Sequence, residues 1–163
     1  MNTTLTVSSR PSGRAARWLG TAFTVLLAAP LTAGTPEPCA GPYVDLGFGK
    51  PGTGGLTPRF EVCGELTAGE KADFELIDGL PNAIAFLLVS PTTAPFPFRG
   101  GTLAPGMPFS SVMPFQLDGN GEYKNRGEGG VGSFTLTLQF VIVDPGAEGG
   151  LSHSNALEVT WQN

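Results

Sequence analysis

Residues Ser133–Val143 read SFTLTLQFVIV, and this stretch decides the class of fold. Every second side chain is apolar from Phe134 to Ile142, and most of the side chains between them are polar: Thr135, Thr137 and Gln139. Successive side chains of a β-strand point to opposite faces, so a period of two predicts a strand with one face on a core. We expect it to be the longest strand of the protein.

Similar signals recur on both sides of this stretch. Lys71–Ile77 alternates between charged and apolar residues, whereas Ala83–Val89 (AIAFLLV) is apolar throughout, which predicts a central strand buried on both faces. Asp144-Pro145-Gly146 turns the chain, and Ala156–Trp161 follows as a closing strand with Leu157, Val159 and Trp161 inward. Further short strands are expected at Tyr43–Leu46, Thr57–Cys63, Gly101–Leu103 and Val112–Leu117, and DGNG at Asp118–Gly121 predicts a tight hairpin.

These strands predict an all-β fold. Turns rich in the 24 glycines and 15 prolines separate them, and beyond the N-terminal segment no long window carries a helical period. About eight or nine such strands are typical of an antiparallel β-sandwich, with a closed β-barrel as the alternative. Because no repeat or linker divides the chain, we expect residues 43–163 to form a single domain, after a proline-rich lead-in at residues 35–42.

The N-terminal residues 1–34 have the pattern of an export signal. Arg10, Arg14 and Arg17 precede the apolar run Trp18–Ala29, and small residues near Ala33 offer a cleavage site. A membrane anchor is the alternative, but the run is shorter than the about 20 apolar residues that a spanning helix needs. We therefore expect a secreted protein, extracellular or at the cell surface, with the periplasm also open, and no stable membrane span after cleavage.

The net charge limits the classes of binding partner, and the cysteine content indicates the redox compartment of the protein. The chain has 9 basic and 14 acidic residues; because three arginines leave with the signal, the processed chain keeps 6 basic residues and a net charge of −8. Such an acidic chain repels phosphate backbones, so nucleic acid is not expected as a partner, whereas a glycan or another secreted or surface protein is. The two cysteines, Cys39 and Cys63, predict one disulfide in an exported protein.

Several stretches also resemble a known group of sequences. They are YVDLGFGKPGTGGLTPRFEVCGEL, LPNAIAFLLVS, PFRGGTLAP, the DGNGE turn and FVIVDPG…GLSHSNALEVTW, which together span most of residues 43–161. In this order they resemble a family of exported bacterial all-β modules without an assigned function, found alone or as the C-terminal domain of larger secreted proteins. The resemblance implies a compact accessory domain and carries over no catalytic or binding residue. Some relatives have a cysteine near the position of Lys50, which leaves the pairing of the cysteines open.

His153, the only histidine, lies between Ser152 and Ser154 and is the first candidate for chemistry. A serine hydrolase needs a nucleophile on a strained turn, an oxyanion site and an acid behind the histidine, and no GxSxG motif is present. Neighbouring residues also rarely place their side chains for mutual proton transfer. We therefore expect His153 to be exposed in the connection that precedes the last strand.

Other candidate patterns have simpler explanations. Asp118, Asn120 and Glu122 resemble the start of a calcium loop but lack its later glycine and glutamate. Lys50 lies in GFGKPGTGG, which lacks the lysine placement and the following helix of a phosphate loop. Asp73 and Glu75 share a strand face and could flank a sugar, but solvated charge explains them as well. The exposed aromatic residues of a sugar-binding platform could be Tyr123, Phe96, Phe98 and Trp161.

The expectation that follows is an exported, non-enzymatic β-sandwich module that acts in binding, adhesion or surface structure. Two alternatives stay open, a carbohydrate-binding module and a small secreted hydrolase. No catalytic residue, metal ligand or cofactor is expected.

Overall fold

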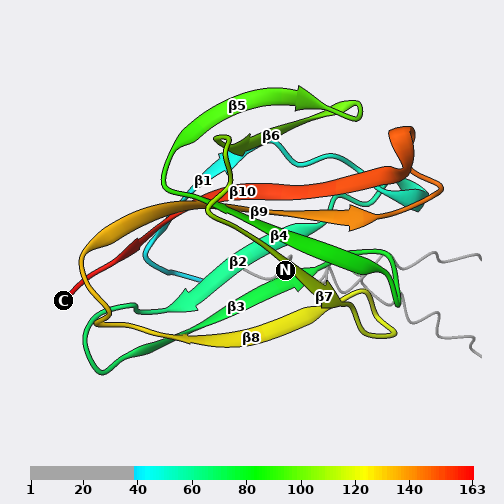
Figure 1. Ribbon diagram of the computed structural model, residues 1–163. Coiled ribbons are helices and arrows are strands. Elements are labelled where there is room, and N and C mark those ends of the chain that lie inside the picture. The colour runs from blue at the N-terminus through cyan, green and yellow to red at the C-terminus, as the bar shows by residue number, and fades with distance from the viewer. Residues whose placement is uncertain (1–38) are drawn as a thin grey trace, which may run out of the picture. The chain divides into compact units, whose positions relative to one another are not determined.

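A computed structural model describes residues 39–163 of the chain, and these residues form two β-sheets and a β-hairpin in three layers (Figure 1). The expected signal peptide at residues 1–34, and residues 35–38 of the lead-in, lie outside the described residues. The strands are β1 (Tyr43–Gly47), β2 (Arg59–Gly64), β3 (Lys71–Ile77), β4 (Ile84–Ser90), β5 (Thr93–Phe98), β6 (Gly101–Pro105), β7 (Ser111–Gln116), β8 (Tyr123–Glu128), β9 (Phe134–Val143) and β10 (Leu151–Trp161), with short 3₁₀ turns η1 (Thr53–Gly55) and η2 (Glu148–Gly150).

The larger sheet has five strands in the order β1-β10-β9-β4-β7, and the smaller has three in the order β2-β3-β8. Neighbouring strands are antiparallel in both sheets and in the β5–β6 hairpin. The prediction of an antiparallel β-sandwich is therefore confirmed, with ten described strands rather than eight or nine. Both sheets are open at their edges, so residues 39–163 do not form the closed alternative.

The main core lies between the two sheets, where the alternating strands place their apolar faces. It includes fully buried side chains from both sheets: Phe60, Val62, Leu76, Phe140, Ile142, Leu157 and Val159. Phe60 of the smaller sheet meets Phe140 of the larger one edge to face, with ring centroids 5.0 Å apart. Full burial of each such side chain stabilises the fold by about 1.5–3 kcal/mol, so this interface holds the sandwich together.

The strand β4 is central and buried on both faces in its second half, as the apolar run predicted. It pairs with β9 on one side and β7 on the other. Its inner face joins the core, while Leu88 on its outer face packs with Val141 and Leu103 beneath the β5–β6 hairpin. In Figure 1 this hairpin lies on the side of the larger sheet opposite to the smaller sheet. The third layer explains why the apolar run does not alternate.

Three sequence predictions about the strands and their connections are wrong. The strand β10 begins at Leu151 rather than Ala156, and its 11 residues make it longer than β9, which has 10. Asp118–Gly121 turns the chain, with the Asp118 carbonyl accepting from Gly121 N at 3.1 Å, but it joins β7 of one sheet to β8 of the other. Turn chemistry is local, whereas the pairing of the flanking strands depends on which apolar face each strand covers.

Candidate functional site

An apolar groove lies between the β5–β6 hairpin and the outer face of the larger sheet, and we call it the hairpin groove. Its volume is about 290 Å³. Every side chain that lines it is apolar, and four are phenylalanines: Phe86, Phe96, Phe98 and Phe109. Concave apolar sites of this kind are where proteins commonly hold small ligands or the side chains of partners.

The groove follows from the alternation of β4 and β7. Leu88 points to the outer face and lies directly opposite Val112 on β7, so the two strands form the apolar floor. The hairpin supplies Phe96, whose ring stacks on Phe109 with centroids 6.5 Å apart. The rim stays open to solvent, because Val112 is 49% exposed and Met107 67% exposed.

The buried side chain of Gln139 holds the hairpin onto the sheet. Its Oε1 accepts a hydrogen bond from Ala104 N at 2.9 Å, and its Nε2 donates to the carbonyls of Thr102 and Ser154 at 3.2 and 3.0 Å. The sequence assigns Gln139 correctly to the polar face of β9, but the hairpin covers that face and leaves the side chain fully buried. Burial of a polar amide is tolerated because these hydrogen bonds replace those with water.

Lys50 is a second polar anchor of the hairpin. The side chain is only 5% exposed, and its Nζ donates to the carbonyls of Arg99 at 2.6 Å and Leu151 at 2.9 Å, and to that of Glu148. These carbonyls belong to the β5–β6 turn, to the start of β10 and to η2. All three N–H groups of the ammonium are therefore engaged by the backbone, so the lysine of the glycine-rich loop clamps three segments together.

The structure contradicts the expected exposure of His153. The residue is fully buried within β10, and its backbone exchanges hydrogen bonds of 2.9 and 3.2 Å with Lys50. Burial of the ring, and secondly the positive charge of Lys50, lower the pKa of the imidazole to about 4. The nearby Thr102 backbone raises this pKa slightly, but it does not form a hydrogen bond with either ring nitrogen. The reason for the error is that β10 starts earlier than expected, so Phe98 of the hairpin, with ring centroids 6.2 Å away, covers the ring.

The serines on either side of His153 do not form a catalytic pair with it. Ser152 lies opposite Ile142 of the core face, whereas His153 lies opposite Val141 of the hairpin face. The Ser154 hydroxyl accepts from Phe140 N at 2.9 Å and donates to the Asn155 carbonyl at 2.7 Å. Among the described residues, neither ring nitrogen of His153 has a hydrogen-bond partner, so no group relays a proton to or from a serine.

No protein family, curated protein or solved structure matches this chain. The resemblance to exported modules therefore stays a prediction. Among residues 39–163, no helix is long and apolar enough to cross a membrane.

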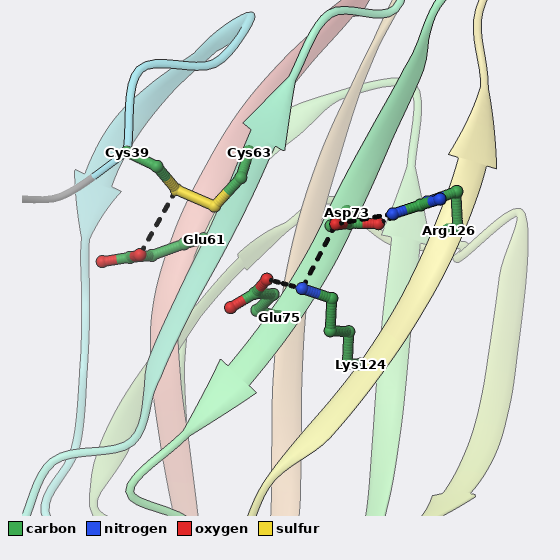
Figure 2. Close-up of polar contacts among 7 residues, drawn as sticks. All are labelled: Cys39, Glu61, Cys63, Asp73, Glu75, Lys124 and Arg126. Atoms are coloured by element: carbon green, nitrogen blue, oxygen red, sulfur yellow. Dashed lines mark hydrogen bonds and ion pairs between the residues drawn. A yellow bond between two sulfur atoms is a disulfide. The ribbon is translucent and has the colours of Figure 1, made fainter.

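The carboxylates of Asp73 and Glu75 belong to a ladder of charges on the outer face of the smaller sheet (Figure 2). Arg126 binds Asp73 through two hydrogen bonds of 2.7 and 3.1 Å, and Lys124 bridges Asp73 and Glu75. The hydrogen bonds from Arg126 and Lys124 lower the pKa of Asp73 to about 2. A glycosidase acid needs a raised pKa to hold its proton at neutral pH, so Asp73 has the opposite property.

Cys39 and Cys63 lie at disulfide distance, with their sulfur atoms 1.89 Å and their Cα atoms 5.3 Å apart (Figure 2). The bridge fastens the segment before β1 to β2. The Glu61 carboxylate lies 3.5 Å from the sulfur of Cys39, and the three side chains are close enough together to suggest a metal site. A sulfur atom bonded to another sulfur is not a thiolate, however, so the bridged pair offers no strong metal ligand.

The aromatic residues that could form a sugar platform are divided between two places. Phe96 and Phe98 line the hairpin groove, whereas Tyr123 and Trp161 pack against the core on the other side of the larger sheet. Trp161 is therefore partly buried, and its indole stacks on the ring of Phe134 with centroids 5.0 Å apart. These residues do not form one row on a common face.

Most of the hairpin groove is not apparent from the sequence. No local pattern marks Phe86, Met107 or Val112 as site residues, and none gives Lys50 or Gln139 a structural role. One signal was available, because an apolar run without alternation, AIAFLLV, requires a cover on its second face. The segment that supplies this cover could not be named from a local pattern.

Proposed function

We propose that this protein is an exported, non-enzymatic β-sandwich module that binds an apolar group in the hairpin groove. The observation that carries the proposal is the groove itself, an apolar cavity whose rim exposes Met107, Val112 and 37% of Phe98. Exposed apolar residues grouped around a cavity mark binding sites, because leaving them in water is unfavourable.

The chemistry of the lining selects the kind of group. Among residues 39–163, no polar or charged side chain lines the groove, so a bound hydroxyl or charge would lose its hydration without compensation. An apolar cavity of about 150 Å³ holds a benzene ring. A groove of about 290 Å³ therefore has room for a segment of an acyl chain or a large apolar side chain.

The framework of the groove also supports a binding role. The buried residues Gln139 and Lys50 attach the hairpin to the sheet through hydrogen bonds, so the groove is largely pre-formed. A pre-formed site avoids part of the entropy cost of ordering on binding. The bridge between Cys39 and Cys63 supports export, because disulfides persist in oxidising compartments.

The two alternative functions receive less support from the geometry. A hydrolase that uses His153 would need the imidazole to reach a substrate, and this ring is fully buried. A carbohydrate-binding module would need hydrogen-bonding groups for sugar hydroxyls, and the hairpin groove offers none. The first observation argues against the hydrolase, and the second favours an apolar target over a sugar.

The test is a titration of the full exported protein with Nile red, an uncharged apolar dye whose fluorescence rises in apolar surroundings. We expect saturable binding that weakens at least tenfold in V112D, because a charge at the rim disfavours the apolar ligand. The matched control is V44D: Val44 is 59% exposed on β1, at the opposite edge of the same sheet. Absence of saturable binding, or equal effects of the two variants, would refute the proposal.

A further inference from the structure

A second cavity, which we call the inter-sheet cleft, lies between the two sheets on the side where β7 and β8 are the edge strands. Its volume is about 250 Å³, and both sheets contribute to its walls. It is separate from the hairpin groove, because Val112 lines the groove and the next residue, Met113, lines the cleft. Adjacent residues of a strand point to opposite faces, so β7 separates the two sites.

The shape of the cleft follows from where the edge strands touch. Near the turn between β7 and β8, the rings of Phe115 and Tyr123 meet with centroids 4.4 Å apart and close that end. Farther along the strands, Met113 is 37% exposed, and Asn125 on β8 is exposed beside the opening. On β8, Gly127 makes room for a ring in the wall, because a Cβ there would lie 2.6 Å from Phe74.

Five aromatic rings dominate the walls of the cleft: Phe74, Phe115, Tyr123, Phe140 and Trp161. The rings of Phe74 and Trp161 are stacked, with centroids 6.1 Å apart and an interplanar angle of 20°. Aromatic rings favour offset stacked or edge-to-face contacts with other rings. The walls therefore suit a flat, aromatic ligand better than a flexible chain.

The polar groups of the cleft are few and uncharged. Asn125 and Tyr123 supply the polar side chains of its lining, and the side chain of neither is hydrogen-bonded to another described residue. Burial raises the pKa of Tyr123, so its hydroxyl stays protonated at neutral pH and can donate. The charges of the neighbouring Lys124 and Arg126 are engaged by Asp73 and Glu75 on the other face of the sheet.

We infer that the inter-sheet cleft is a binding site for a neutral, planar aromatic molecule that carries one hydroxyl or carbonyl group. The ring system stacks among the aromatic walls, and its polar group bonds to Asn125 or Tyr123. Because a cavity of about 150 Å³ accepts one benzene ring, a cleft of about 250 Å³ accepts two fused rings. A charged ligand is disfavoured, since none of the described residues that line the cleft has a charged side chain to replace its hydration. This inference does not depend on the function of the hairpin groove.

The experiment is a titration of the full exported protein with 2-naphthol, a neutral bicyclic molecule with one hydroxyl, followed by calorimetry. We expect saturable binding that M113D weakens at least tenfold and V112D leaves unchanged. Nile red has four fused rings, which exceed the two that the cleft accepts, so with this dye V112D should weaken binding and M113D should leave it unchanged. The two probes thus distinguish failure of one site from failure of the other. Asn125→Ala should weaken the binding of 2-naphthol and leave the binding of naphthalene, which lacks the hydroxyl, unchanged.

A second measurement covers the case in which M113D fails to fold. In the wild-type protein, 2-naphthol should shift the NMR signals of the Trp161 indole N–H and the Asn125 side-chain amide along one saturation curve. The inference is overturned if 2-naphthol does not bind, if V112D abolishes its binding, or if those signals stay unmoved. It is also overturned if chitotriose binds and moves them in its place, since that outcome would indicate a carbohydrate site.

Discussion

The buried imidazole of His153 should make the stability of this protein depend on pH between about 4 and 6.5. In the unfolded chain His153 has its ordinary pKa near 6.5, whereas in the folded protein burial and Lys50 lower the pKa to about 4. Between these values the unfolded state binds a proton that the folded state does not. Stability is therefore complete above pH 6.5 and decreases as the pH falls toward 4.

The size of the effect follows from the two pKa values. One pKa unit corresponds to about 1.4 kcal/mol of differential interaction. At pH 5 the imidazole of the unfolded chain is about 1.5 pH units below its pKa and is protonated, whereas the folded imidazole is still largely neutral. Between pH 7 and pH 5 the free energy of unfolding should therefore fall by about 2 kcal/mol. Since His153 is the only histidine in the sequence, no second imidazole contributes.

The assay is urea unfolding of the wild type and of His153→Leu at pH 7, 6 and 5. Leucine fills a similar volume and does not titrate, so carboxyl groups contribute to both proteins and cancel in the comparison. We expect the wild type to lose about 2 kcal/mol relative to the variant between pH 7 and pH 5. Parallel curves for the two proteins, or an NMR titration of folded His153 near pH 6.5, would show that the imidazole is not desolvated as argued.

Three further perturbations test other parts of the fold. Lys50→Met leaves three partly buried carbonyls without their donor and should lower the free energy of unfolding by about 3 kcal/mol in urea, whereas a loss below about 0.5 kcal/mol would show that the clamp is unimportant. Reduction of the bridge between Cys39 and Cys63, which are 24 residues apart, should cost about 3 kcal/mol in melts with and without reductant, and unchanged melts would contradict this. Asp73 contributes stability that is present above pH 3.8 and lost as the pH falls toward 2. In Asp73→Asn the free energy of unfolding should therefore depend less on pH in this range. The same pH dependence in the variant and the wild type would argue against the pairing of Asp73 with Arg126.

The strands that have one face on the main core could be predicted from local pattern. In β3, alternation assigned Ala72 and Leu76 inward and Asp73 outward, and the structure has Ala72 and Leu76 fully buried. In β9, the period of two located the strand to within one residue. Such strands are predictable because one face meets solvent and the other the core, so polar and apolar residues alternate along the sequence.

The candidate sites were less predictable, because each depends on segments far apart in the chain. The hairpin groove needs Phe86 of β4, Phe96 of β5 and Val112 of β7, whose grouping no local pattern indicates. The exposure of His153 was predicted wrongly for the same reason. Its neighbours in the sequence are small and polar, and the residues that bury it, Lys50 and Phe98, are distant along the chain.

The sequence by itself determined that this is an all-β protein, where most of its strands run, and that two cysteines are available to bridge. It could do so because period, turn residues and composition are local properties. Only the tertiary structure decided that the β5–β6 hairpin forms a third layer and that Lys50 and Gln139 are buried anchors. It also decided that the edge strands β7 and β8 leave a cleft between the sheets. These features arise because each apolar sheet face must be buried against another segment. Which segment buries it depends on packing over the whole chain.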